Sequence, residues 1–284
     1  MKEVLTVVAR DGIHLSATCF IAKHPHERVV LINSATGVKQ QFYSDFAKWL
    51  ANEGFHVYTF DYRGIGNSRP ENLKDVLYDM HDWSADVDAM ISYISHEHPH
   101  ARLIIAGHSI GGQLIGMANL SHQADAFVMI GSQTPYWKNY PGFIMKLKLL
   151  LFWYILIPVL TRLFGYFPTS RFNLFEDLPE EVARQWSRWA RNRNYIFDEL
   201  PAEQKSFEAL RQRTLVISFA DDTLAPPAAV QDLNRFYKNL KREHWHLHPD
   251  DVMKKSVGHF GFFRKQMEAV LWRETAQWLL KDFS

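Results

Sequence analysis

Apolar and polar residues alternate along residues 2–8 and again along residues 13–20, with a turn at Asp11-Gly12 between them. Alternation with a period of two indicates strands buried on one face, so these segments are predicted to form an antiparallel hairpin. Short, continuous apolar runs follow, as is typical of strands buried on both faces. These strands are expected at residues 28–33, 55–61, 102–106, 126–131 and 214–219, with a further strand at 244–248.

Segments with helical spacing of their apolar residues lie between these strands. They cover residues 43–51, 82–94, 114–120, 178–190, 227–237 and 263–280. Strands that alternate with helices predict an α/β fold, in which one mostly parallel, eight-stranded sheet carries helices on both faces. Ligands of such sheets bind beyond the carboxyl ends of the strands.

The alternation stops between residues 132 and 201, a segment rich in Trp, Tyr and Phe. We therefore predict a core domain of residues 1–131 and 202–284, with a helical cap (lid) of residues 132–201 inserted after the sixth strand. The longest apolar run, residues 147–160, is shorter than the roughly 20 residues that span a membrane, and it contains Lys148 and Pro158. The prediction is that it is not a transmembrane helix, although the lid could touch a membrane surface transiently.

The charge balance and the cysteine content indicate which partners and which cellular location to expect. The chain of 284 residues has 32 Lys plus Arg against 31 Asp plus Glu, so no basic footprint for nucleic acid is expected. Its one cysteine, Cys19, lies in an alternating segment typical of a buried structural thiol. Because the first residues lack the apolar region of a signal peptide, a cytoplasmic location is expected.

The stretch AGHSIGGQ (106–113) places Ser109 where a predicted strand ends and a predicted helix begins. A sharp strand-to-helix turn brings two backbones together, so Gly107 and Gly111 are expected where a Cβ atom would clash. Such a turn, the nucleophile elbow, exposes a serine hydroxyl at a helix N-terminus. A phosphate-binding loop or a plain glycine-rich turn is the alternative interpretation of these residues alone.

A nucleophilic serine needs a histidine base, and the histidine needs a carboxylate that fixes its tautomer. Asp221 and Asp222 follow the predicted strand 214–219, and His259 precedes the last helix, which gives the order Ser, Asp, His. His108 is expected to be a pocket wall beside the nucleophile. Histidines 244, 246 and 248 share a strand face, but no carboxylate or cysteine completes a metal site there, so none is predicted.

Five motifs together resemble the α/β-hydrolases of the serine aminopeptidase and lysophospholipase type, over nearly the whole chain. They are NSATGV (33–38), DYRGIGNS (61–68), GHSIGG (107–112), DDTLAP (221–226) and GHFG (258–261). TPYW (134–137) and the tryptophans at 186 and 189 further resemble a bacterial group known mainly as predicted hydrolases. The resemblance favours Asp222 over Asp221 as the acid, because the family's acid stands four residues before a proline, here Pro226.

An oxyanion also needs two donors. The amide of Ile110 at the helix N-terminus is expected to be one of them. The resemblance places the second donor in the loop after the third strand, where this family usually has His-Gly before the donor residue. This chain has Asn33-Ser34-Ala35 there, so the amide of Ala35 is expected to take the role.

These residues predict a serine hydrolase that cleaves a carboxylic ester of a small apolar acyl or aromatic substrate through an acyl-enzyme, without a cofactor. An amidase or aminopeptidase, a thioesterase, or an acyltransferase on the same triad are the alternatives, and a non-catalytic module that binds apolar ligands is an alternative of another class. In the insertion, Trp137, Phe152 and Trp153 either line a substrate cleft or pack the lid onto the core.

Overall fold

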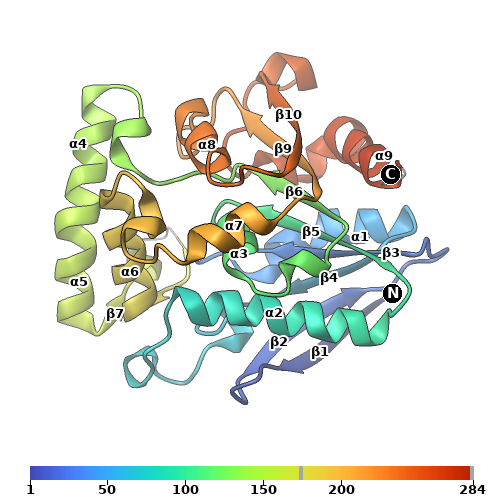
Figure 1. Cartoon of the computed structure of the whole chain (residues 1–284), viewed down its shortest axis with the longest axis horizontal. Coiled ribbons are helices and arrows are strands. Elements are labelled where there is room, and N and C mark those ends of the chain that lie inside the picture. Colours follow the sequence, from blue (N-terminus) through green and yellow to red (C-terminus); the bar gives the residue numbers. More distant parts are fainter. Residues whose placement is uncertain (173–174, 282–284) are drawn as a thin grey trace.

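The computed structural model describes residues 1–172 and 175–281, and its centre is one eight-stranded sheet of order β1-β2-β4-β3-β5-β6-β9-β10 (Figure 1). Strands β1 and β2 form the predicted antiparallel hairpin, β2 pairs antiparallel with β4, and the other neighbours are parallel. The strands are β1 (Lys2–Val8), β2 (His14–Phe20), β3 (Arg28–Asn33), β4 (His56–Phe60), β5 (Arg102–His108), β6 (Ala126–Ile130), β9 (Arg213–Phe219) and β10 (Lys241–Leu247).

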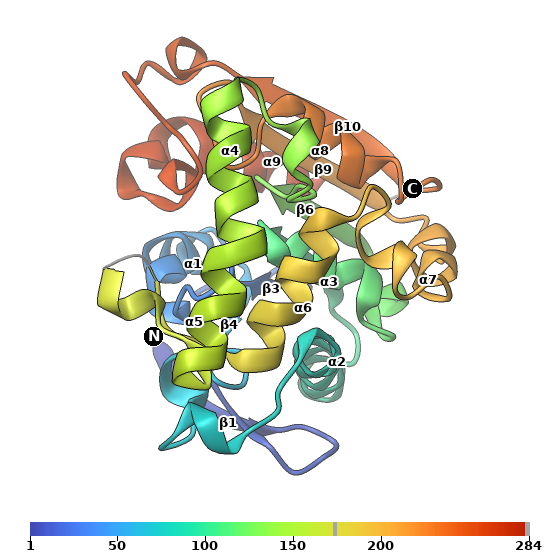
Figure 2. The same ribbon diagram turned by 90° about the vertical axis from the view of Figure 1, so that its left-hand side faces the viewer.

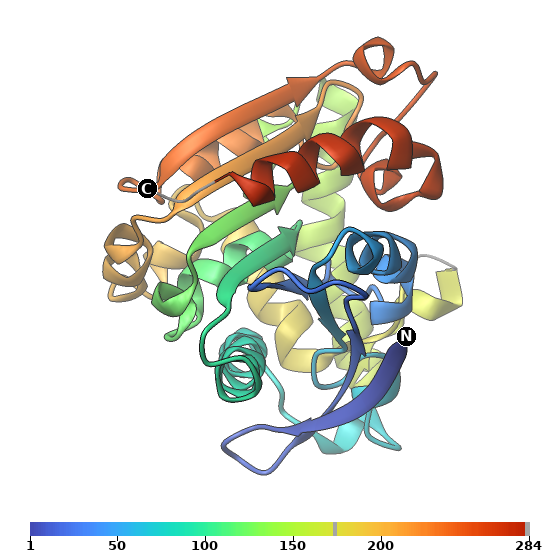
Figure 3. The same cartoon turned by 90° about the vertical axis from the view of Figure 1, so that its right-hand side faces the viewer.

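Helices cover both faces of the sheet, as the continuous apolar runs predicted. Along β3, Leu31 packs into the core layer beneath α2, whereas Val30 and Ile32 pack into the opposite layer. Figure 3 shows α1 and α9 together on that second side. The core helices are α1 (Ser44–Asn52), α2 (Met80–Glu97), α3 (Ile110–Met117), α7 (Glu203–Ala209), α8 (Pro227–Asn234) and α9 (Arg273–Leu280).

The last helix differs from its prediction. Residues 263–280 were expected to form one helix, but α9 begins only at Arg273, after short 3₁₀ turns and a π-helical turn at Glu268–Trp272. The indole N–H of Trp272 donates to the carbonyl of Phe262 across these turns. Apolar periodicity does not distinguish such turns from an α-helix, since residues three and four apart share a face in both.

Among the described residues, the segment between β6 and α7 carries three α-helices, several short helical turns and a small ribbon. The helices are α4 (Phe143–Leu151), α5 (Ile157–Phe164) and α6 (Glu180–Arg191), and the ribbon pairs β7 (Tyr166–Phe167) with β8 (Leu178–Pro179). A π-helical turn, Phe152–Leu156, joins α4 to α5, so the two form one rod at the edge of the molecule (Figure 1), and α6 lies beside it (Figure 2). The ribbon was not predicted, because two residues give no detectable alternation.

This rod corrects the length argument made from the sequence. It runs without a break from Phe143 to Phe164, 22 residues, and is long and apolar enough to cross a membrane. Pro158 does not end it, because the proline is the second residue of α5, directly after the π-helical turn that ends at Leu156, where its missing N–H and the bulk of its ring are tolerated. Only 11% of the most apolar part of the rod is buried.

The predicted cleft residues of this segment lie in different surroundings. Trp153 is 3% exposed, and its ring centre lies 4.8 Å from that of Trp186 on α6. Its carbonyl accepts a hydrogen bond from the Ser187 hydroxyl. Phe152 is half-buried against Trp153, whereas Trp137 lies half-exposed beneath the Lys138 ammonium. Trp153 therefore fastens the rod to α6.

Trp153→Ala is expected to lower the free energy of unfolding by about 3–5 kcal/mol, because it removes a buried indole and leaves a cavity. The preference for substrate chain length should stay as in the wild type. Chemical denaturation and a series of substrates measure the two effects. The half-exposed Trp137→Ala is the control, with a smaller loss of stability. A changed chain-length preference at unchanged stability would instead place Trp153 in the substrate cleft.

Candidate active site

Ser109 lies at the turn between β5 and α3 in a conformation that side chains rarely adopt. Its backbone has φ 54° and ψ −116°. The flanking glycines have the steric role that the sequence predicted, because a Cβ atom at Gly107 would overlap the backbone of Gly112, and one at Gly111 would overlap the Asn33 carbonyl. The turn thus holds Ser109 at the carboxyl end of the central strand, 8% exposed.

His259 and Asp222 form a buried pair. Nδ1 of His259 lies 2.8 Å from Oδ2 of Asp222, and the two residues are 8% and 2% exposed. The other carboxylate oxygen of Asp222 accepts hydrogen bonds from the amides of Leu224 and Ala225, both at 2.9 Å. These bonds fix the carboxylate at the end of β9, so it orients the imidazole ring.

Asp221 has a separate set of partners. Its carboxylate accepts from the Ser256 hydroxyl and from the amides of Val257 and Gly258, at 2.7 to 3.0 Å. Burial alone would raise the pKa of Asp221, but these hydrogen bonds hold it below its usual value. Asp221 therefore fastens the loop that leads to His259, and only Asp222 contacts the ring.

Gly131, just after β6, lies between the turn that carries Ser109 and the His259–Asp222 pair. A Cβ atom there would lie 3.2 Å from His259 Nδ1 and 3.3 Å from Asp222 Oδ2, at a φ of +57°. The amide of Ser109 donates to the carbonyl of Ile130, the preceding residue. Within residues 1–172 and 175–281, no hydrogen bond joins the Ser109 hydroxyl to His259, and such bonds are often long before substrate binds.

A buried chain of hydrogen bonds runs behind the pair. The amide of Ala35 donates to the Tyr43 hydroxyl at 2.8 Å, this hydroxyl lies 2.9 Å from His108 Nδ1, and His108 Nε2 lies 3.0 Å from the carbonyl of His259. Burial lowers the pKa of His108 well below its usual value, so the ring is neutral. Because a carbonyl only accepts, Nε2 carries the proton and Nδ1 accepts from Tyr43.

Two predicted roles are wrong in view of this chain. His108 is fully buried and both its ring nitrogens are engaged, so it cannot be a pocket wall that meets substrate. The amide of Ala35 already donates to Tyr43, so it cannot also stabilise an oxyanion. The sequence offered no signal for Tyr43, which reaches His108 from 65 residues away.

A cavity of 530 Å³, called the cap–core cavity after the predicted cap, opens between the core and the segment that follows β6, which contributes Ser170, Phe175 and Glu176. Phe42, Phe175 and Phe260 give it apolar walls, and Phe260 directly follows His259. Its carboxylate, Glu176, lies 3.1 Å from the Lys39 ammonium. The cavity therefore offers an apolar surface beside the His259 loop.

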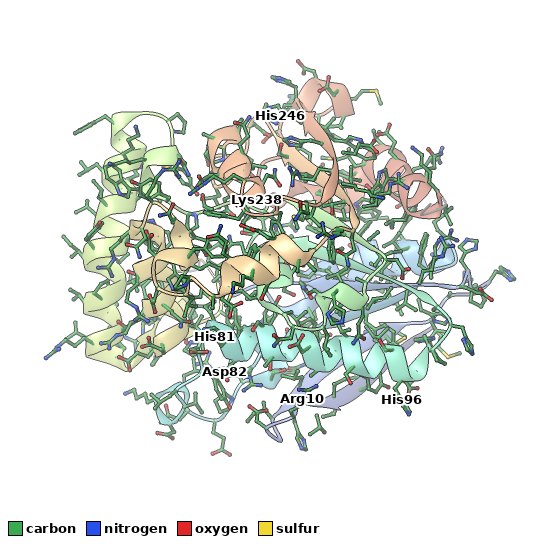
Figure 4. The ribbon with its side chains drawn as sticks, viewed as in Figure 1. Arg10, His81, Asp82, His96, Lys238 and His246 are labelled. Atoms are coloured by element: carbon green, nitrogen blue, oxygen red, sulfur yellow. The ribbon has the colours of Figure 1, made fainter. Side chains whose placement is uncertain are left out.

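A larger cavity of 740 Å³ lies between β1 and α2, and none of the candidate active-site residues lines it. Arg10 and His96, which border it, are labelled below α2 in Figure 4, away from the α4–α5 rod. His246 lies on β10 at the other side of the molecule, where it and His244 approach the Ser218 hydroxyl. Among the residues that the structure describes, no group of three or more side chains is placed to hold a metal ion.

The sheet topology and the elbow at the end of β5 define an α/β-hydrolase. The chain belongs to the family described as serine aminopeptidase, S33, whose model matches residues 24–251. The predicted α/β-hydrolase family and its core fold are thereby confirmed, and the division into core and cap stays a prediction.

Several known proteins are similar to this chain. The uncharacterized protein YfhR of Salmonella typhimurium is 26% identical over an alignment of 139 residues that covers 44% of this chain and 45% of that relative. The esterase EaEST from Exiguobacterium antarcticum has a TM-score of 0.64 at 17% identity, covering 98% of this chain and all of its own. A monoacylglycerol lipase of Paleococcus ferrophilus has a TM-score of 0.62 at 16% identity, covering 93% of this chain and 98% of its own. At these identities, the solved structures show the fold alone.

Proposed function

We propose that this hydrolase cleaves carboxylic esters through an acyl-enzyme, with Ser109 as nucleophile, His259 as base and Asp222 as the residue that orients His259. The observation that carries the proposal is the left-handed backbone of Ser109 at the end of β5, beside a buried His259–Asp222 pair that packs on Gly131. A serine is held in such a strained turn at the cost of about 1–3 kcal/mol, which a plain turn would avoid.

The proton route follows from the pair. Nδ1–H of His259 donates to Asp222, which leaves Nε2 to accept the hydroxyl proton as Ser109 Oγ attacks the ester carbonyl carbon. His259 then gives this proton to the leaving alcohol as the C–O bond breaks. Water then attacks the acyl carbon of the acyl-enzyme and loses a proton to His259. His259 returns this proton to Ser109 Oγ as the bond between Oγ and the acyl carbon breaks and the acid leaves.

We assign the oxyanion donors to the amides of Ile110 and Thr36. Ile110 is the first residue of α3. The first amides of a helix have no intrahelical acceptor and lie at the positive end of the helix dipole. Thr36 follows Ala35 in the loop after β3, and it takes the place of Ala35, whose amide is already bonded to Tyr43. A backbone donor is insensitive to side chain, which fits the absence of His-Gly from this loop.

The cap–core cavity supports an ester rather than an aminopeptidase substrate. An aminopeptidase holds the free α-ammonium of its substrate with carboxylates, whereas Glu176 of this cavity is paired with Lys39. The aromatic walls instead suit an apolar acyl chain. Two of the similar proteins are named an esterase and a monoacylglycerol lipase.

The decisive experiment is a substrate panel run on the purified protein. We expect p-nitrophenyl esters to be hydrolysed with a kcat/KM that rises with acyl length until the cavity is filled, and aminoacyl p-nitroanilides to be cleaved far more slowly. A fluorophosphonate probe should label the wild type and not Ser109→Ala. Faster cleavage of the anilides would favour an aminopeptidase, and a protein without labelling or turnover would be a binding module.

Tyr43→Phe is expected to lower kcat about tenfold with KM nearly unchanged. Without the Tyr43 hydroxyl, the His108 ring is no longer held in the tautomer that donates to the His259 carbonyl, so His259 is positioned less well. The free energy of unfolding should fall by about 1–3 kcal/mol, since the Ala35 amide and His108 Nδ1 lose a buried partner. The matched control is Tyr62→Phe, whose equally buried hydroxyl has no hydrogen-bond partner within the described residues. Steady-state kinetics and denaturation measure both. Equal effects of the two variants would contradict a positioning role.

A further inference from the structure

The outer face of the α4–α5 rod is a continuous apolar surface open to solvent. Its most exposed side chains are Phe143, Ile144 and Leu163, at 79%, 71% and 70%. The others are Leu147, Leu151, Tyr154, Ile155, Leu156 and Val159, each exposed by 39% or more. Soluble monomers rarely expose so large a contiguous patch unless something covers it.

The charges of the rod have a single sign. Residues 143–164 contain Lys146, Lys148 and Arg162 and no aspartate or glutamate. A cavity of 270 Å³ at the edge of the rod, between α5 and α6, adds further arginines. Its walls include Arg162 and Arg191, for which no ion pair with a carboxylate is found within residues 1–172 and 175–281. A surface that is apolar in its middle and cationic at its edges complements an anionic lipid bilayer.

The inner face of the rod determines the orientation that the rod would take at a lipid bilayer. Trp153, Ile157 and Thr161 are buried and follow one another at intervals of four residues, on the side that packs against α6. Helix α6 carries charged side chains that cannot enter hydrocarbon, among them the pairs of Arg184 with Glu180 and of Arg188 with Glu181. The rod can therefore enter a bilayer only lengthwise, while α6 stays in water.

A second copy of the chain fits the same surface poorly. Two rods that pack antiparallel about a two-fold axis near the middle of the rod would bring Lys146 and Lys148 of one copy close to Arg162 of the other. The rod has no carboxylate to balance these charges, and like charges in contact oppose association. Lipid phosphates would neutralise all of them.

We propose that the α4–α5 rod docks the protein on an anionic lipid bilayer, lying parallel to the membrane with its apolar face among the upper acyl chains and its cations at the phosphates. This docking is independent of the ester chemistry proposed above, since it is measured as binding.

Flotation of the purified 284-residue protein with lipid vesicles tests the docking. The protein should bind phosphatidylcholine vesicles that contain about one third phosphatidylglycerol at least about tenfold more tightly than pure phosphatidylcholine vesicles. The variant Ile144→Glu/Leu151→Glu/Ile155→Glu changes one face, because the three positions are seven and four residues apart. It should lose binding to both vesicles by about tenfold or more. Lys148→Gln/Arg162→Gln should remove only the preference for anionic lipid.

Matched variants exclude effects of charge alone. Val4→Glu/Leu77→Glu/Met253→Glu replaces apolar side chains that are 69%, 83% and 80% exposed on other surfaces, and it should bind vesicles like the wild type. Arg10→Gln/Lys48→Gln, at exposed positions outside the rod, is the control for the cationic pair. Circular dichroism verifies that every variant is folded.

Three results would overturn the proposal. The first is a wild type that does not float with anionic vesicles. The second is a dimer, measured by analytical ultracentrifugation, that the glutamate variant of the rod dissociates while no vesicles are bound, because the rod would then join two copies. The third is a membrane fraction that resists extraction with alkaline carbonate, because the rod would then cross the bilayer.

Discussion

Ser109→Ala is expected to lower kcat by about 10⁴-fold or more and to leave stability nearly unchanged. Alanine removes the attacking oxygen but keeps the Cβ atom, so the strain of the left-handed turn is the same in both proteins. The hydroxyl makes no hydrogen bond within the described residues, so its loss leaves no buried group without a partner. Ester hydrolysis and thermal unfolding measure the two effects.

Ser132→Ala is the matched control for this variant. Ser132 lies two residues after β6, and its hydroxyl donates to the Gly107 carbonyl at 3.2 Å. It should therefore lose about 1 kcal/mol of stability and keep most of its activity. Wild-type turnover by Ser109→Ala would show that another residue is the nucleophile, and the proposed function would then fail.

Asp222→Asn is expected to lower kcat by a similar factor, about 10⁴-fold, because an amide in place of the carboxylate lets the His259 ring adopt the wrong tautomer. The carboxylate also stabilises the imidazolium that forms when His259 takes the proton from Ser109. Binding of substrate does not depend on that charge, so KM should change much less than kcat. Steady-state kinetics over a range of pH measures both constants.

Asp221→Asn is the control, since it makes the same chemical change one residue earlier without touching the ring. It should lower kcat only mildly and mainly reduce stability. The lowered pKa of Asp221 means that its contribution to stability is present above the unfolded-state pKa and is lost as the pH falls through the folded-state pKa. In the variant, the free energy of unfolding should therefore fall less steeply as the pH is lowered into the acid range. A larger loss of kcat than that of Asp222→Asn would transfer the orienting role to Asp221.

The parts of the fold that the sequence predicted are those determined by local chemistry. Continuous apolar runs located the parallel strands, and the spacing of Gly107 and Gly111 located the strained turn, because only glycine tolerates such close backbones. The order of Ser109, Asp222 and His259 along the chain was visible, and the structure places Asp222 and His259 in contact at the carboxyl edge of the sheet near Ser109.

Features that depend on contacts between distant segments could not be predicted. The Tyr43 hydroxyl occupies the Ala35 amide and the His108 ring, and neither contact leaves a trace in spacing or periodicity. The length of the rod was underestimated because only residues 147–160 were counted as apolar, and because Lys148 and Pro158 within them were taken as signs against a long apolar helix. A π-helical turn, which no residue pattern announces, allows the helix to continue past the proline.

The backbone conformation of Ser109 lowers the stability of the fold, although it exposes the hydroxyl on which the proposed reaction depends. A residue with a side chain at φ 54° is destabilised by about 1–3 kcal/mol, and glycine at that position would be relieved of most of this strain. Selection for stability alone would therefore replace the serine, whereas the reaction proposed above would retain it. A descendant that no longer needed the reaction could gain a firmer fold by this one substitution, so glycine at this turn would identify the members of a lineage that have abandoned catalysis.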